Sequence, residues 1–66
     1  MTITDMDVLD AFDSIGDVSI PSSLLEARLL DEGFNLPDIV ENLFNLVNRG
    51  LFVVNITGFI QRASLN

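Results

Sequence analysis

Cysteine and histidine are both absent from this chain of 66 residues, which excludes disulfides, thiolate metal sites and imidazole general bases. Lysine is absent too, and three arginines stand against ten aspartates and glutamates, giving a formal net charge of −7. That balance opposes nonspecific binding to nucleic-acid phosphates. So short a chain also offers little room for a substrate cleft. We therefore expect a protein that is not an enzyme, with no catalytic residues, no metal and no cofactor.

Long hydrophobic runs are missing as well. No run approaches the ~20 residues of a membrane span, and the N-terminus lacks the positively charged region of a signal peptide. We therefore expect a cytoplasmic protein with no membrane partner. Hydrophobic residues nevertheless make up 48% of the chain, too many for an acidic disordered tail, so residues 1–66 are expected to form a single domain.

The acidic residues are mostly aspartate, seven of the ten. A surface that is rich in aspartate and free of lysine, on a well-filled core, resembles the proteins of halophiles that accumulate salt. We therefore expect a salt-adapted protein from an archaeon or from an archaeal virus.

The stretch from Asn35 to Gly50 predicts an amphipathic helix over residues 36–49. At about 100° per residue, its apolar residues fall in one arc of about 160° and its polar residues fill the opposite arc. The apolar residues are Leu36, Ile39, Val40, Leu43, Phe44, Leu46 and Val47. Asn35 is expected to cap this helix with Asp38 three residues on, and Gly50 to end it in the left-handed conformation.

A first helix is predicted over residues 5–15, because apolar residues recur there at helical spacing. Thr4 and Asp7 form a capping box at its start. A short strand over residues 18–20 follows. Pro21 closes that strand, because proline cannot donate to a strand ladder.

A second helix is predicted over residues 24–32. Its start carries the clearest short signal in the chain, a capping box of Ser23 and Glu26. Gly33 ends it only three residues before the helix at 36–49 begins. So short a connection sets two helices at a steep angle, in the helix-turn-helix arrangement.

After Gly50 the period changes to that of a strand, and a hairpin is predicted over residues 51–63. Residues 51–54 are its first arm, Thr57 and Gly58 form the turn, and residues 59–63 return.

The order of helix, short strand, two helices and a hairpin resembles the winged helix-turn-helix family. Residues similar to the family's third helix running into its first wing strand are Leu43, Leu46, Val47, Arg49, Gly50, Leu51 and Phe52, and Gly58-Phe59-Ile60 resembles the return strand. The resemblance covers about residues 4–63. It implies a mainly α fold of three helices with a small β-hairpin, in a wing of two or three antiparallel strands.

In that family the third helix usually lies in the DNA major groove and the wing contacts the backbone. The resemblance therefore implies a DNA-binding transcriptional regulator. Its candidate DNA contacts are Asn42, Asn45, Asn48 and Arg49 on the third helix, with Arg62 on the wing. Asp38 and Glu41 depart from the family pattern, because they bring negative charge to the end that meets phosphate.

Two other interpretations stay open. The polar face of the third helix can be a solvated surface, in which case the chain is a winged-helix module for protein–protein interaction. An acidic surface can also mimic nucleic acid and occupy a nucleic-acid-binding partner.

A homodimer is a further expectation. Four consecutive apolar residues in a strand point alternately to both faces of a sheet, and only one face can lie on the helices. The family pattern turns Leu51 and Val53 inward. Phe52, Val54 and Ile56 are then left outside as a candidate dimer interface.

Overall fold

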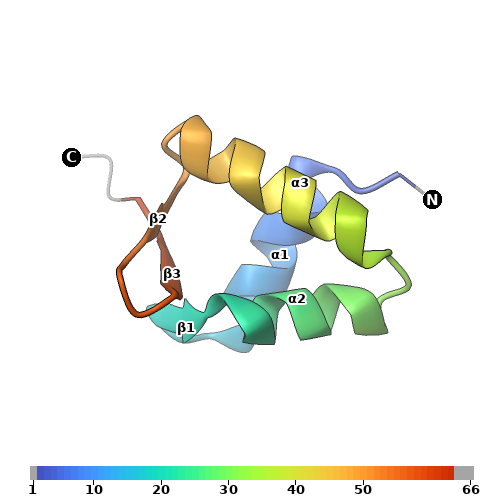
Figure 1. Ribbon diagram of the computed structural model, residues 1–66. Coiled ribbons are helices and arrows are strands. Elements are labelled where there is room, and N and C mark those ends of the chain that lie inside the picture. The colour runs from blue at the N-terminus through green and yellow to red at the C-terminus, as the bar shows by residue number, and fades with distance from the viewer. Residues whose placement is uncertain (1, 64–66) are drawn as a thin grey trace.

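The computed structural model of the protein describes residues 2–63. The described elements are α1 (Asp5–Ile15), β1 (Ser19–Pro21), α2 (Ser22–Asp31), α3 (Leu36–Asn48), β2 (Phe52–Val54) and β3 (Phe59–Arg62). The strands form one antiparallel sheet in the order β1-β3-β2, and the helices pack together beside it (Figure 1). This winged-helix arrangement of three helices and a small antiparallel sheet confirms the predicted fold class.

Side-chain caps begin two of the helices as predicted. The backbone N–H of Asp7 donates to Thr4 Oγ1 at 3.3 Å, and the Thr4 N–H donates to Asp7 Oδ2 at 2.9 Å. At α3 the backbone N–H of Asp38 donates to Asn35 Oδ1 at 3.0 Å. Each bond satisfies an N–H group that the first turn of a helix leaves without a partner.

The start of α2 differs from the prediction. The helix begins at Ser22, Pro21 occupies the N-cap position, and no side chain caps it. The predicted capping box of Ser23 and Glu26 is therefore wrong. The reason is tertiary: Pro21 already belongs to the sheet, and the Ser22 N–H donates to the Gly58 carbonyl oxygen across it at 3.0 Å.

The ends of α2 and α3 share one geometry. After α3, Gly50 takes a positive φ of 79°, its N–H donates to the Val47 carbonyl oxygen, and the Leu51 N–H donates to Leu46. This is the Schellman motif, in which a left-handed residue satisfies the last carbonyl groups of a helix. Gly33 ends α2 in the same way, with a φ of 103°.

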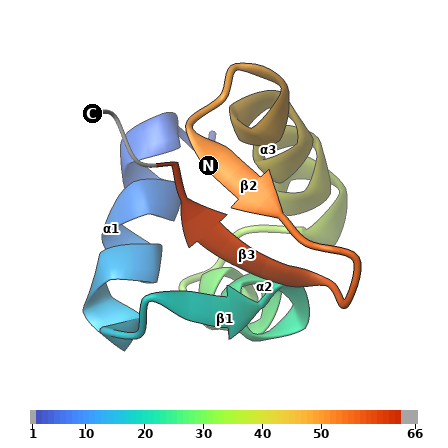
Figure 2. The ribbon, with the colours of Figure 1, turned by 90° about the vertical axis from the view of Figure 1, so that its left-hand side faces the viewer.

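The sheet has three strands, because β1 pairs with β3 on the side away from β2 (Figure 2). Ile20 lies opposite Ile60, and Ile60 lies opposite Val54. The first strand covers residues 19–21 rather than 18–20. Val18 is exposed outside it.

The hairpin is turned over relative to the prediction. Phe52 is only 1% exposed, whereas Val53 is exposed, so the expected inward Val53 and outward Phe52 are wrong. The cause is the Schellman motif, which uses Leu51 as part of the helix end, so that the strand begins one residue later than the pattern suggests. The alternation of side chains between the two faces therefore begins at Phe52, and the inward direction expected of Leu51 does not extend to Val53.

One core holds all the elements together. Its buried members are Val8, Ala11, Phe12, Ile20, Leu25, Leu29, Phe34, Ile39, Leu43, Leu46, Phe52 and Ile60. All six helices and strands contribute to it, and the turn between α2 and α3 adds Phe34. Among residues 2–63, no helix is both long and apolar enough to cross a membrane.

Candidate functional site

The exposed surface of α3 is the candidate site, and it includes part of the predicted apolar arc. Only Ile39, Leu43 and Leu46 of the predicted apolar arc are buried. Leu36, Val40 and Phe44 are exposed, Phe44 to 64%, and Val47 is half-buried. An apolar stripe of about 100° is enough for a helix to cover a core, and the predicted arc is wider, about 160°. The rest of the arc is therefore an apolar strip on the exposed surface of α3.

The polar side of α3 faces two ways. Asn45, Asn48 and Arg49 are exposed and line one shallow hollow of about 330 Å³ together with Asp5 of α1. The structure thus brings three of the five candidate DNA contacts together at the C-terminal end of α3. Arg62 lies apart from them, on β3, in an ion pair with Asp13 of α1.

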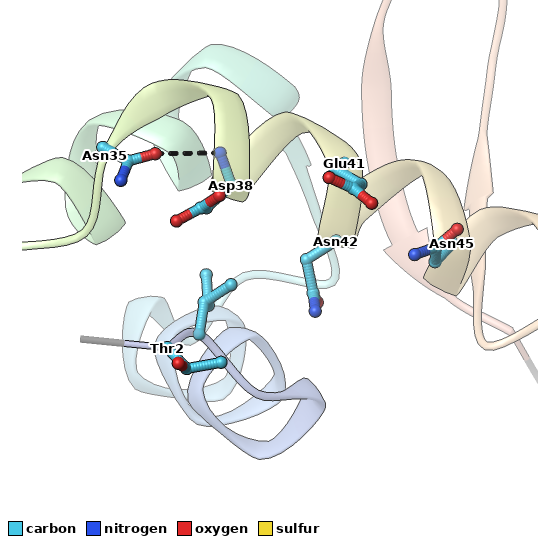
Figure 3. A pocket seen from close by; sticks show the side chains of 7 residues that line it. Thr2, Asn35, Asp38, Glu41, Asn42 and Asn45 are labelled. Atoms are coloured by element: carbon cyan, nitrogen blue, oxygen red, sulfur yellow. Dashed lines mark hydrogen bonds between the residues drawn. The ribbon is translucent and has the colours of Figure 1, made fainter.

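Asn42 is placed differently from the other candidate contacts. Its side chain is directed from α3 toward the segment that precedes α1, where Thr2 lies (Figure 3). The residue is half-buried, and its Oδ1 atom is buried with no hydrogen-bond partner among the described residues. The expected exposed position of Asn42 is therefore wrong, because this part of the polar arc borders the contact between α1 and α3.

A second hollow, of about 520 Å³, opens beside Asn42. It is lined by Thr2, Ile3, Asn35, Asp38, Glu41, Asn42 and Asn45 (Figure 3). Two carboxylates and no cation line it, so its charge disfavours a phosphate. Within residues 2–63 no cluster of three or more acidic side chains is placed to hold a metal ion.

Every arginine of the chain is paired with a carboxylate of the chain. Arg49 donates to Asp5, Arg62 Nη1 lies 2.9 Å from Asp13 Oδ2, and Arg28 Nε lies 3.4 Å from Glu32 Oε2. All six side chains are about half exposed, so each pair contributes only about 0–1 kcal/mol to stability. The charges of Arg49 and Arg62, the two cationic candidate DNA contacts, are nevertheless balanced within the fold.

The third hollow is an apolar groove of about 230 Å³, which we call the α2–α3 groove. Its lining residues come from α2, α3, β2 and β3: Ser22, Glu26, Val40, Leu43, Phe44, Val47, Val54 and Ile60. Val54, one of the candidate dimer residues, therefore lies on the helix side of the sheet. Ile56, another, is fully exposed in the turn between β2 and β3.

Sequence reasoning missed this groove. The signal that could have found it is the width of the apolar arc on α3, which exceeds what one core contact can bury.

Comparisons of the chain with protein-family models, with curated proteins and with solved structures find no match.

Proposed function

We propose that this chain is a cytoplasmic, non-catalytic module for protein–protein interaction, built on a winged-helix fold. The observation that carries the proposal is the charge of the α3 surface. Arg49 and Arg62 are each paired with an aspartate of α1, and the third arginine of the chain, Arg28, is paired with Glu32.

The exposed apolar strip of α3 supports the same conclusion. An apolar patch bordered by polar residues on a small monomer is typical of a surface that contacts another macromolecule. In the winged-helix family this same helix would enter the major groove of DNA. In a major groove, Phe44 and Val40 would form no contact with phosphate that could replace those of the paired arginines.

DNA binding is the second candidate, and one observation favours it. Asn45, Asn48 and Arg49 lie together on exposed helix surface, and asparagine and arginine can form paired hydrogen bonds with adenine and guanine. The ion pair of Arg49 with Asp5 is exposed, so releasing the arginine costs little.

Selection from a pool of random DNA duplexes tests the choice. The selection is run with the wild-type chain at low KCl and at about 1 M KCl, because salt weakens phosphate contacts. We expect no enriched motif in either condition. Two variants enter the same selection as a matched pair. Asp5→Asn removes the carboxylate that pairs with Arg49, and Asp10→Asn makes the same change of net charge elsewhere on α1.

A motif enriched by the wild-type chain and lost in Arg49→Ala would decide for a DNA-binding regulator. The complementary measurement places a photo-crosslinking amino acid at position 44, on the exposed strip of α3, and at position 53, on the outer face of the sheet. Crosslinking of a protein from a lysate of the source organism through position 44 alone is the expected result.

A further inference from the structure

We propose that the α2–α3 groove binds an amphipathic helix of a partner protein whose apolar face is flanked by lysine or arginine. This inference rests on the proposed function and specifies the partner's chemistry.

The shape of the apolar surface fits a helix. Leu36, Val40, Phe44 and Val47 follow one another at intervals of four, four and three residues, so they form one row along the axis of α3. The eleven helical steps from Leu36 to Val47 give the row a length of roughly 16 Å. Rows with this spacing are the ridges that pack into the grooves of a second helix.

The volume of the groove fits side chains rather than a small molecule. At about 230 Å³ it is smaller than the roughly 300–1,000 Å³ of most small-molecule sites. Its apolar lining comes from α3 and from Val54 and Ile60 of the sheet, and α2 adds Ser22 and Glu26. Side chains at intervals of three and four residues on a partner helix can enter such a groove as anchors.

The charges beside the groove indicate which residues should flank the apolar face of the partner helix. Glu26 of α2 lines the groove, and Glu41 lies one turn before Phe44 on the exposed side of α3. Neither glutamate forms an ion pair with a described residue, and the three arginines are held by Asp5, Asp13 and Glu32. The groove is therefore apolar, with the Glu26 carboxylate in its lining and the Glu41 carboxylate in the adjoining hollow, one turn from Phe44. This arrangement complements a helix with an apolar face and basic flanks.

The same charges argue against a second copy of this chain. A symmetric dimer through the groove would bring two net charges of −7 together and place the Glu26 side chains of both copies near one interface. The chain contains no lysine and no unpaired arginine to offset them.

The test uses two synthetic peptides of 18 residues with the same apolar helix face, one flanked by lysine and arginine and the other by glutamate. Both carry fluorescein, and binding to the full chain is followed by fluorescence anisotropy. The KCl concentration is the lowest at which circular dichroism shows a folded chain. We expect the basic peptide to bind at least about tenfold more tightly than the acidic one.

Two substitutions in β2 provide a matched pair. Val53 and Val54 are neighbours with similar exposures, 48% and 44%, but only Val54 lines the groove. Val54→Ser should weaken binding of the basic peptide about tenfold, whereas Val53→Ser should leave it within about twofold. Equal effects of the two substitutions would place the peptide elsewhere and overturn the proposal.

A second set of variants tests the charges. Glu26→Gln and Glu41→Gln together should weaken the basic peptide several-fold, and Glu26→Lys with Glu41→Lys should invert the preference between the peptides. Asp10→Asn with Asp17→Asn changes the net charge equally at exposed residues outside the groove lining and is the control. If this control weakens binding as much as the glutamine pair does, only net charge matters and the groove is not the site.

The remaining outcomes separate this proposal from the proposed function. The proposal of a basic partner helix is overturned if neither peptide binds. It is also overturned if sedimentation shows a dimer that Val54→Ser dissociates. Each leaves a protein-interaction module with a different contact. Enrichment of a DNA motif that depends on Arg49 overturns the proposed function, whatever the peptides do.

Discussion

The ring of Phe52 in β2 lies against the ring of Phe12 in α1, with centroids 5.2 Å apart and planes inclined by 47°. This tilted contact joins the first helix to the wing across 40 residues of sequence. Phe12 and Phe52 are both buried, so the pair contributes burial as well as ring–ring attraction.

The first prediction concerns Phe52. Phe52→Ala should destabilise the chain by about 3–5 kcal/mol, because it leaves a cavity against Phe12. A domain of this size is expected to have only about 3–10 kcal/mol of stability, so a largely unfolded variant is the expected result by circular dichroism. Phe44→Ala is the control and should cost about 1 kcal/mol or less. Similar losses for both would contradict the orientation of β2.

The second prediction concerns the turn after α3. Gly50→Ala should cost about 1–2 kcal/mol, because the φ of 79° is unfavourable for a side chain. An added Cβ would meet no atom within 4 Å, so the cost is backbone strain and not a clash. Gly50→Asn should lose less, since asparagine tolerates this conformation. Urea unfolding measures both, and an unchanged midpoint for Gly50→Ala would argue against the Schellman motif.

The third prediction compares two helix starts. Asn35→Ala removes the cap of α3 and should cost about 1 kcal/mol, whereas Ser23→Ala at α2 should be close to neutral. The sequence pattern alone would give both residues the role of a cap. Thermal unfolding of the two variants in the same buffer distinguishes them, and a loss at Ser23 equal to that at Asn35 would support the capping box that the structure lacks.

The fourth prediction concerns salt. Three of the ten carboxylates pair with arginine, leaving seven that do not, which are Asp7, Asp10, Asp17, Glu26, Asp31, Asp38 and Glu41. Their mutual repulsion should be screened as the Debye length falls from about 10 Å at 0.1 M salt to about 3 Å at 1 M. The melting temperature should therefore rise from low to molar KCl.

Asp10→Asn sharpens the salt experiment. It should stabilise the chain at low KCl and make little difference at about 1 M, because it removes one repelling charge. Asp10→Glu keeps the charge and is the control. A melting temperature that stays flat across the KCl series would remove the interpretation of a salt-adapted surface.

Local sequence signals determined the helices of this protein. Thr4 with Asp7, and Asn35 with Asp38, are caps between residues three apart, and Gly33 and Gly50 set helix ends through their own backbone conformation. Such features depend on a few neighbouring residues, so they can be predicted from the chain alone. Ser23 does not cap α2, because the helix already begins at Ser22, whose N–H donates to the Gly58 carbonyl oxygen.

The candidate site depended on longer-range relationships. Arg49 and Asp5 are separated by 44 positions, and Arg62 and Asp13 by 49, so no local pattern predicted that these two candidate DNA contacts would be paired with carboxylates. The inward face of β2 was fixed by the helix end before it.

The apolar arc of α3 shows the same division. Its periodicity determined that the segment is helical and amphipathic, because that follows from 3.6 residues per turn. Which apolar residues are buried was decided by the positions of α1, α2 and the sheet around it. They cover Ile39, Leu43 and Leu46 and leave Val40 and Phe44 at the surface, because three helices and a short sheet enclose only part of that arc.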